Sequence, residues 1–303
     1  MKKFYYFLVL FSVFSHFLFS QKKEERTYSE IRKPYEKMTI DDINAMPYVK
    51  LYIQKAKNEN NFSKLIQGYR DGRQFDYKNK MKYADSALTV SLNQGTHDDI
   101  SKEYLSKGII YYFYQKKYKL ALNEYLKAYS YLKGSKDEYH YYKVLYHLGI
   151  VKGHLGYYDE AMNHFLKCTS YYRSKLDENH HENEKFNHEK AYLNCLHQLT
   201  VLNRYLNNFN KSDSLSMLGY RLTANNSDFA LEKSYFLKCI GISRYHKKDY
   251  NGARNQLRQC LPTILKRNDF AWASVVYYYL GKTYEVQNDI DRAVGCYEKI
   301  DSI

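Results

Sequence analysis

Apolar residues along most of the chain recur three and four positions apart, in pairs of stretches joined by a short polar turn. In residues 142–175, Leu145 and Leu148 belong to the first stretch and Phe165 to the second, with "HLGYYDE" between them. This spacing is typical of amphipathic helices. No stretch alternates apolar and polar residues for long enough to predict a strand, and only 13 Gly and 3 Pro interrupt the 303 residues. The pattern therefore predicts an all-α protein.

The paired stretches repeat at a nearly constant interval. The frame is set by one position shortly after each turn, which in successive copies is occupied by Lys80, Ala121, Ala161, Ser212, Ala253 and Ala293. The intervals between these residues are 41, 40, 51, 41 and 40. A period of about 40 is the sign of a solenoid of helical pairs. The one longer interval is due to a polar insert at 177–190.

The turn sequence itself predicts how two helices meet. Gly149 and Ala161 are small where the two backbones approach most closely, and Gly156 can adopt the positive φ that closes the first helix. Asp159 follows at the start of the second helix, where an acid is favoured by the helix dipole. In a later copy Pro262 falls inside the second helix, and we expect it to kink that helix or to end it early.

At these residues the chain resembles the tetratricopeptide repeat family. The copy at 142–175 matches the family pattern at Leu145, Leu148, Gly149, Gly156, Tyr158, Ala161, Phe165 and Cys168. The chain departs from the pattern where Lys152 and Arg244 replace the first-helix aromatic residue of their copies, and where Ser212 and Ser216 make another copy degenerate. The resemblance implies a right-handed solenoid of antiparallel helix pairs, with five to six helical hairpins over residues 60–303.

The N-terminus has the features of an export signal. Lys2 and Lys3 precede an apolar run of 16 residues, and Ser20 is a small residue before polar sequence. As a helix this run would rise about 24 Å, which is short of a hydrocarbon core of about 30 Å. We therefore expect residues 1–20 to be a signal peptide cleaved after Ser20, the alternative being an uncleaved anchor. The mature chain would be exported, into the periplasm of a Gram-negative host. Residues 21–59 are then an N-terminal segment and capping helix.

Charge and motifs exclude several classes of function. The net charge is +14, but the basic residues are spread along the chain and export argues against a nucleic-acid partner. The five cysteines form no C-x-x-C pair, although a single disulfide is compatible with an oxidising compartment. We interpret His180, His181 and His188 of the insert as part of a solvated loop and expect no metal site or cofactor. No catalytic motif is present, which indicates a protein that is not an enzyme.

The resemblance also implies a binding groove. In the family, certain first-helix positions line the concave face and hold a peptide or a partner helix. The corresponding residues here are Phe113, Tyr114, Tyr146, Ile150, His154, His197, Arg204, Tyr205, Lys238, Ile242, Tyr245, Tyr278 and Lys282, with Glu103 and Glu285 as acids. Such a lining suits an acidic or aromatic-bearing protein segment. The alternative is that a protein with 36 Tyr places tyrosines on every surface.

Two functions follow from these patterns. The first is an exported, non-enzymatic scaffold that binds a peptide or protein partner in its groove. The second is the sensor portion of a truncated membrane-spanning transcriptional regulator or sensor kinase, because a signal-like start followed by such repeats resembles the extracytoplasmic half of AraC-type regulators. The apolar residues of the final hairpin, among them Val294 and Tyr297, have no successor to cover them. We therefore expect either a longer chain or self-association through this end.

Overall fold

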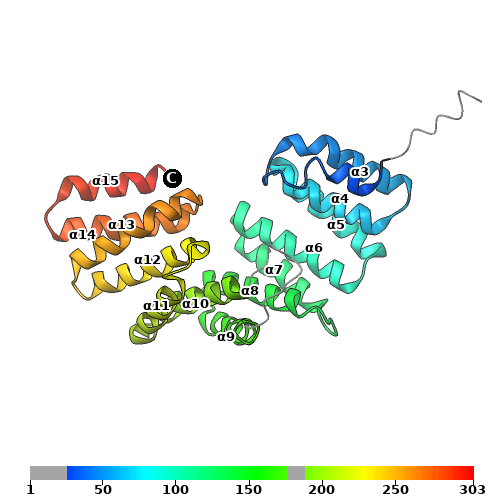
Figure 1. The fold of residues 1–303 in the computed structure, drawn as a ribbon. Coiled ribbons are helices and arrows are strands. Elements are labelled where there is room, and N and C mark those ends of the chain that lie inside the picture. The colour runs from blue at the N-terminus through cyan, green and yellow to red at the C-terminus, as the bar shows by residue number, and fades with distance from the viewer. Residues whose placement is uncertain (1–25, 177–187) are drawn as a thin grey trace, which may run out of the picture. The chain divides into compact units, whose positions relative to one another are not determined.

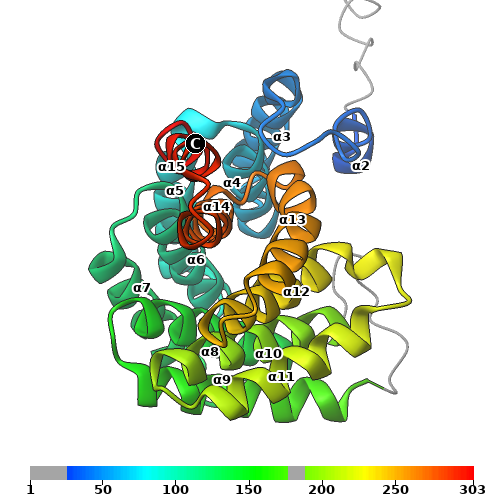
Figure 2. The ribbon, with the colours of Figure 1, turned by 90° about the vertical axis from the view of Figure 1, so that its left-hand side faces the viewer.

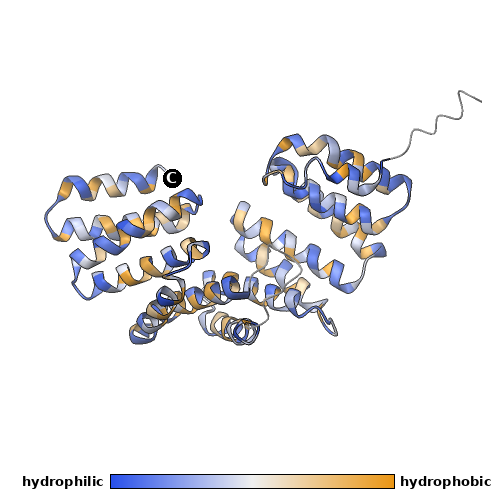
Figure 3. Cartoon of the chain, in the orientation of Figure 1, coloured by the Kyte–Doolittle hydropathy of each residue, from blue (hydrophilic) through white to orange (hydrophobic). Residues whose placement is uncertain are grey.

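The computed structural model describes residues 26–176 and 188–303, and in these residues it contains fourteen α-helices, α2 to α15, and no strand. The chain divides into two compact units, Met1–Lys107 and Gly108–Ile303. Helix α6 (His97–Ile109) crosses the boundary between them. Along every helix, hydrophobic and hydrophilic residues are interleaved (Figure 3), as an amphipathic helix requires. The prediction of an all-α protein is confirmed.

The N-terminal unit packs its helices around a small aromatic core. Its elements before α6 are α2 (Tyr28–Arg32), η1 (Ile43–Ala45), α3 (Met46–Asn58), α4 (Phe62–Phe75), η2 (Tyr77–Asn79) and α5 (Lys80–Gln94). Tyr35, Val49 and Phe75 form the centre of the core and are at most 2% exposed. Thr27 closes a capping box with Glu30 and so fixes the start of α2. Helices α3, α4 and α5 pack in sequence as antiparallel neighbours.

The C-terminal unit consists of stacked helix pairs (Figures 1 and 2). Its elements are η3 (Ile110–Tyr114), α7 (Tyr118–Ser130), α8 (Glu138–His154), α9 (Tyr158–Ser174), α10 (His188–Tyr205), α11 (Phe209–Thr223), η4 (Ser227–Phe229), α12 (Ala230–His246), α13 (Tyr250–Lys266), α14 (Phe270–Val286) and α15 (Ile290–Asp301). Each helix packs on the next, and the first helices of the pairs, α8, α10, α12 and α14, also touch in succession. This is the solenoid of antiparallel helix pairs that the repeat predicts.

The turn inside each pair has the same backbone conformation. Five residues before the small residue of the frame, φ is positive at Lys116, Gly156, Asn207, Lys248 and Asn288, with values of 56°, 87°, 60°, 64° and 59°. The prediction for Gly156 is therefore confirmed. Asn tolerates this left-handed region, but for Lys it costs free energy that the packing around the turn must offset. A repeated turn of one conformation gives every pair a similar helix–helix angle.

Small residues in the first helix face large ones in the second. A Cβ atom at Gly149 would lie 2.9 Å from Cζ of Phe165, and one at Gly281 would lie 2.5 Å from Cε1 of Tyr297. In the degenerate copy the hydroxyl of Ser212 donates instead to the carbonyl of Thr200 across the pair, at 2.9 Å. The close approach of the helices is thus kept by a different pair of residues.

The first pair of the C-terminal unit contains one extra residue. Gly149, Gly241 and Gly281 each stand 12 positions before the small residue of their copy, whereas Gly108, which packs on Tyr125, stands 13 before Ala121. The additional residue is absorbed by the π-helical turn η3. Such single-turn π-helices are often found at functional sites. The nearly constant repeat interval does not reveal this additional residue.

Some expectations from the sequence fail or fall outside the described residues. Pro262 neither ends nor breaks α13, because its ring lies on the exposed side while Leu257 and Ile264 hold the opposite face in the core. The last three residues of the polar insert, 188–190, already belong to α10. The predicted signal peptide and the pair His180 and His181 lie outside the described residues. Among the residues described, no helix is long and apolar enough to cross a membrane.

Candidate functional site

Aromatic and cationic side chains gather where the C-terminal halves of α10, α12 and α14 lie side by side. We call this group the tyrosine surface, and it consists of Arg204, Tyr205, Tyr245, His246, Tyr278, Tyr279 and Lys282. The ring of Tyr279 meets Tyr245 at 5.4 Å and Tyr278 at 5.2 Å between centroids, both edge-to-face. The imidazole Nε2 of His246 lies 3.4 Å from the hydroxyl of Tyr279. Arg204 and Tyr205 are close enough to influence the phenol of Tyr279 electrostatically.

The repeat explains why these residues meet. Arg204 and Tyr245 each stand eight positions before the small residue of their copy, and Tyr205 and His246 each stand seven before it. Side chains at equivalent positions of successive first helices point in the same direction, so residues one repeat apart in the sequence become neighbours on the surface. Tyr205 and Tyr278 are 61% and 47% exposed. These two rings are therefore available to a partner, while Tyr245 and Tyr279 form a half-buried floor.

The guanidinium of Arg204 contacts a backbone carbonyl and a carboxylate, and the side chain is 18% exposed. Its Nη2 donates to the carbonyl of Cys239 at 3.2 Å. The carboxylate of Asp213 lies 3.9 Å away and is bound more closely by Lys247, at 2.6 Å. Burial alone would raise the pKa of Asp213, but hydrogen bonds from Lys247 and Ser243 outweigh it and lower that pKa. Arg204 is thus positioned by the carbonyl of Cys239 and, more loosely, by the carboxylate of Asp213.

Three of the residues expected in the groove lie in the interior instead. His197, Lys238 and Ile242 are 2%, 1% and 6% exposed, so the expectation that they line the surface is wrong. Ile242 belongs to a hydrophobic core cluster with Leu257 and Leu280. These residues belong to the packed interior of the helices that carry the tyrosine surface. Burial was not readable from the helical period because first helices in the middle of a stack are covered on more than one face.

Lys238 and His197 form a polar contact inside the stack. The ammonium of Lys238 lies 3.1 Å from Nε2 of His197 and 3.0 Å from the centroid of the Trp272 ring. Burial lowers the pKa of Lys238 to about 8 and holds the pKa of His197 well below its usual value. The ring of His197 stacks on Tyr235, whose hydroxyl donates to Asp269 at 2.6 Å. The contact joins α10, α12 and α14 about two helical turns before Arg204, Tyr245 and Tyr279 of the tyrosine surface.

A second aromatic group lies at η3 and α8. Phe113 and Tyr114 are 45% and 44% exposed. The ring of His154 packs on the ring of Tyr118, with 3.7 Å between the centroids. Although the residue is exposed, this partial burial of the imidazole lowers its pKa. Tyr146 and Ile150 are half-buried and pack against a core cluster that includes Phe165. Burial also raises the pKa of Tyr146. The structure therefore divides the expected groove residues between two groups and the interior.

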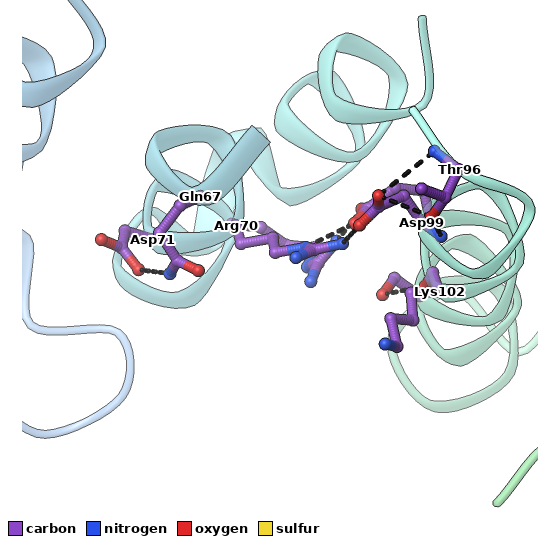
Figure 4. A network of polar contacts seen from close by, with 9 residues as sticks. Gln67, Arg70, Asp71, Thr96, Asp99 and Lys102 are labelled. Atoms are coloured by element: carbon purple, nitrogen blue, oxygen red, sulfur yellow. Dashed lines mark hydrogen bonds and ion pairs between the residues drawn. The ribbon is translucent and has the colours of Figure 1, made fainter. Parts of the chain in front are cut away.

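Sequence reasoning missed one central member of the tyrosine surface, Tyr279. The run of three tyrosines at 277–279 could have signalled it, but the family positions select only Tyr278. It also placed Glu103 in the groove. That carboxylate is fully buried in the N-terminal unit, where Arg70 and Arg73 bind it at 2.6 and 2.8 Å. Figure 4 shows Arg70 of this network reaching Asp99 of α6 as well.

The described part of the chain contains no group of three or more His, Cys, Asp or Glu residues able to hold a metal ion. The residues that gather on the tyrosine surface are phenols, cations and one imidazole. This set can stack, donate hydrogen bonds and attract acids.

No family model matches this sequence, and no curated protein matches it. Among solved structures, the apo form of RapI is similar over 89% of this chain and 93% of that one, with a TM-score of 0.66 and 15% identity. A Rap protein complexed with Competence and Sporulation Factor is similar over 85% and 70%, with a TM-score of 0.63 and 16% identity. A signal-transduction ATPase of Pyrococcus horikoshii with a tetratricopeptide repeat sensor is similar over 90% and 38%, with a TM-score of 0.51 and 12% identity. At these identities the likeness shows the fold alone, and the fold is tetratricopeptide-repeat-like.

Proposed function

We propose that this protein is an exported, non-enzymatic scaffold that binds a peptide or protein segment on its tyrosine surface. The observation that carries the proposal is the gathering of Arg204 and Tyr205 of α10 and Tyr278 of α14 around the half-buried rings of Tyr245 and Tyr279. Tyr and Arg are enriched at the positions that dominate binding free energy. Tyrosine rings offer large contact areas with few rotatable bonds, so little entropy is lost on binding. The fold supports the proposal, since a Rap protein of this fold is complexed with Competence and Sporulation Factor.

The charges favour an acidic segment that also carries aromatic side chains. Arg204 has donors beyond the one used by Cys239. The end of α12 adds Arg244, Lys247 and Lys248 beside the surface, against the acids Asp213 and Asp249. An incoming carboxylate would make a charge-assisted pair with Arg204, and Asp213 would remain bound to Lys247.

Substitution of Tyr205, Tyr278 and Arg204 tests this proposal. Peptides are selected from a displayed library on the mature chain, and their dissociation constants are measured by calorimetry. We expect Tyr205→Ala, Tyr278→Ala and Arg204→Ala each to weaken binding about tenfold or more. Tyr157→Ala is the matched control, because Tyr157 is 52% exposed on the same unit but lies at the start of α9. Helical content measured by circular dichroism should stay unchanged. If the three variants bind the selected peptides as tightly as the wild type does, the tyrosine surface is not the binding site.

Export is the second part of the proposal. The apolar run that ends at Ser20 motivates it, and the site of action would be the periplasm of a Gram-negative host. N-terminal sequencing of the exported protein should begin at Gln21. Recovery of intact Met1 in the membrane fraction would contradict cleavage.

The sensor portion of a membrane-spanning regulator is the alternative proposal. It uses the same fold and the same surface, and it differs only in what is encoded with this segment. The nucleotide sequence beyond codon 303 separates the two, because a frame encoding an apolar run and a helix-turn-helix domain would favour the sensor.

We further propose self-association through the final hairpin. Ile290 and Val294 are 52% and 47% exposed on α15, one helical turn apart. Burial of such a stripe against a second copy is favourable. Light scattering on Val294→Glu should then show a smaller mass than the wild type at high concentration. A wild-type chain that is monomeric at the same concentration would contradict this part.

A further inference from the structure

Three arginines gather around one buried tyrosine ring in the last two helical pairs. Tyr284 is 3% exposed on α14, which packs on both α13 and α15 (Figure 1). The guanidinium carbons of Arg254 and Arg258 on α13 lie 5.5 and 6.0 Å from the centroid of this ring, and that of Arg292 on α15 lies 5.1 Å from it. Three positive charges from two helices therefore meet around one ring, and none of these residues belongs to the tyrosine surface.

The two arginines of α13 have no acidic partner. Helix α13 itself contains no Asp or Glu. Arg258 is exposed, and it makes no hydrogen bond or ion pair within the described residues. Arg254 is half-buried, and its two Nη atoms donate to the amide oxygens of Gln287 and Asn251, which are neutral. Neither positive charge is therefore compensated by an ion pair.

Arg292 is the member that pairs with a carboxylate. Its partner is Asp289, which also caps the start of α15, and the side chain of Arg292 is still 62% exposed. Asp291 is exposed and forms no ion pair in the part of the chain that the structure describes. The carboxylate of Glu285 on α14 is bound by Lys282. One carboxylate thus contacts a group of three guanidinium groups, and the mutual repulsion of these like charges is unfavourable unless a further anion binds.

The repeat does not require a cation at these positions. Arg258 stands five positions after the small residue of its copy, and no other copy has a basic residue there. Three earlier copies carry apolar residues at this position that are 44%, 54% and 45% exposed, namely Leu126, Leu166 and Met217. Helix pairs of this chain therefore stack without an arginine here, so the charge is a feature of this pair rather than of the fold.

We propose that Arg254, Arg258 and Arg292 bind a phosphate group. A phosphate monoester carries about two negative charges at neutral pH, and two positive charges remain after Asp289 has paired with one arginine. A single carboxylate would compensate only one of them. All three cations are arginines, in a chain whose basic residues are mostly lysines. The planar guanidinium donates two parallel hydrogen bonds to the oxygens of phosphate, which an ammonium group does not do.

The test measures the binding of inorganic phosphate to the mature chain by calorimetry. It is done at low ionic strength, since salt screens exposed charges, and at about pH 8, where phosphate is doubly charged. Arg258→Gln should weaken binding about tenfold or more, and Arg258→Lys should weaken it less. Arg267→Gln is the matched control, because Arg267 is also exposed and follows the end of α13 directly, away from Tyr284. This control should bind phosphate as the wild type does.

A second measurement identifies the source of the phosphate. The chain is sedimented with vesicles of phosphatidylcholine and phosphatidic acid, and with vesicles in which phosphatidylserine replaces the phosphatidic acid. Sedimentation with phosphatidic acid alone, lost in Arg258→Gln, assigns the phosphate to a lipid headgroup. Heat with inorganic phosphate but no sedimentation assigns it to a free phosphate or a small phosphorylated molecule. Both results support the site.

Three results would overturn the phosphate site. The first is the absence of phosphate-dependent heat in the wild type. The second is an equal dissociation constant for the wild type and Arg258→Gln, or an equal loss of affinity in Arg258→Gln and Arg267→Gln, since the latter would reflect net charge only. The third is a short polyglutamate peptide that binds through Arg258 while phosphate does not, which would assign these arginines to an acidic protein segment. None of these results bears on the tyrosine surface, because the two sites share no residue.

Discussion

In the N-terminal unit the fully buried Glu103 meets two guanidinium groups, whereas in the C-terminal unit the equally buried Lys238 meets an imidazole and an indole ring. The arginines around Glu103 are 21% and 27% exposed and keep part of their hydration. Lys238 has only 1% exposure, and its partner His197 is neutral. The two units therefore handle a buried charge differently: one neutralises it with opposite charges and the other shifts its pKa.

This difference teaches how each charge acts on the fold. A buried carboxylate between two arginines is stabilised by attraction, and removal of one partner leaves an uncompensated charge. A buried ammonium among neutral groups is stabilised only by a hydrogen bond and by the face of an aromatic ring, so desolvation dominates. The first arrangement should withstand changes of pH, while the second should respond to them.

The largest effect should come from Glu103→Gln. The amide keeps the shape of the side chain but turns an N–H₂ group toward the guanidinium groups, which lose a charged acceptor. We expect the free energy of unfolding to fall by about 3 kcal/mol, measured by urea denaturation. Glu36→Gln is the matched control, because Glu36 is exposed in the same unit. Equal stabilities of the two variants would mean that the buried network contributes nothing.

The next largest effect should be the dependence of the free energy of unfolding on pH that Lys238 causes. The folded pKa is lowered to about 8, from 10.5 in the unfolded chain. Between these values the unfolded state binds more protons, so stability rises with pH, and the cost of the buried charge is complete below pH 8 and gone above pH 10.5. Relative to Lys238→Met, the wild type should gain up to about 3 kcal/mol across this window. Urea denaturation of both proteins at each pH tests this. If the free energy of unfolding changes with pH in the same way for the wild type and Lys238→Met, the pKa of Lys238 is not lowered.

At pH 7 the same variant, Lys238→Met, should change stability by less than about 1 kcal/mol. Removal of a buried charge is favourable, but His197 then loses the donor on its Nε2, and an unsatisfied buried group costs about 1–3 kcal/mol. The two effects nearly cancel. A loss of several kcal/mol would show instead that the ammonium stabilises the stack.

The smallest effect should come from Lys282→Ala. Lys282 pairs with Glu285 at 2.8 Å on the surface of α14. The hydrogen bond that Lys282 donates to Glu285 raises the pKa of Lys282, but exposed pairs of this kind contribute little. The midpoint of thermal unfolding should stay within experimental error of the wild type. A clear drop in the midpoint would show that this exposed pair stabilises the fold as the buried network around Glu103 does.

Much of the fold could be predicted from the sequence because the repeat records it locally. The small residues of the frame and Gly156 appear in the structure with the packing and backbone conformation that their type requires. The candidate site was predicted less well. Arg204, Tyr205, Tyr245 and Tyr278 belong to the tyrosine surface, but Lys238 lies inside. Side-chain burial depends on how helices from different copies are stacked, and a period within one copy does not contain that information.

The sequence by itself determined the all-α class and the solenoid of antiparallel helix pairs, because these depend on short-range periodicity and on the φ preferences of single residues. Only the tertiary structure decided the π-helical turn at η3, the continuation of α13 through Pro262, and the contact between His197 and Lys238. Each of these depends on residues distant in the chain, whose packing outweighs a local preference or brings together groups that no spacing in the sequence relates.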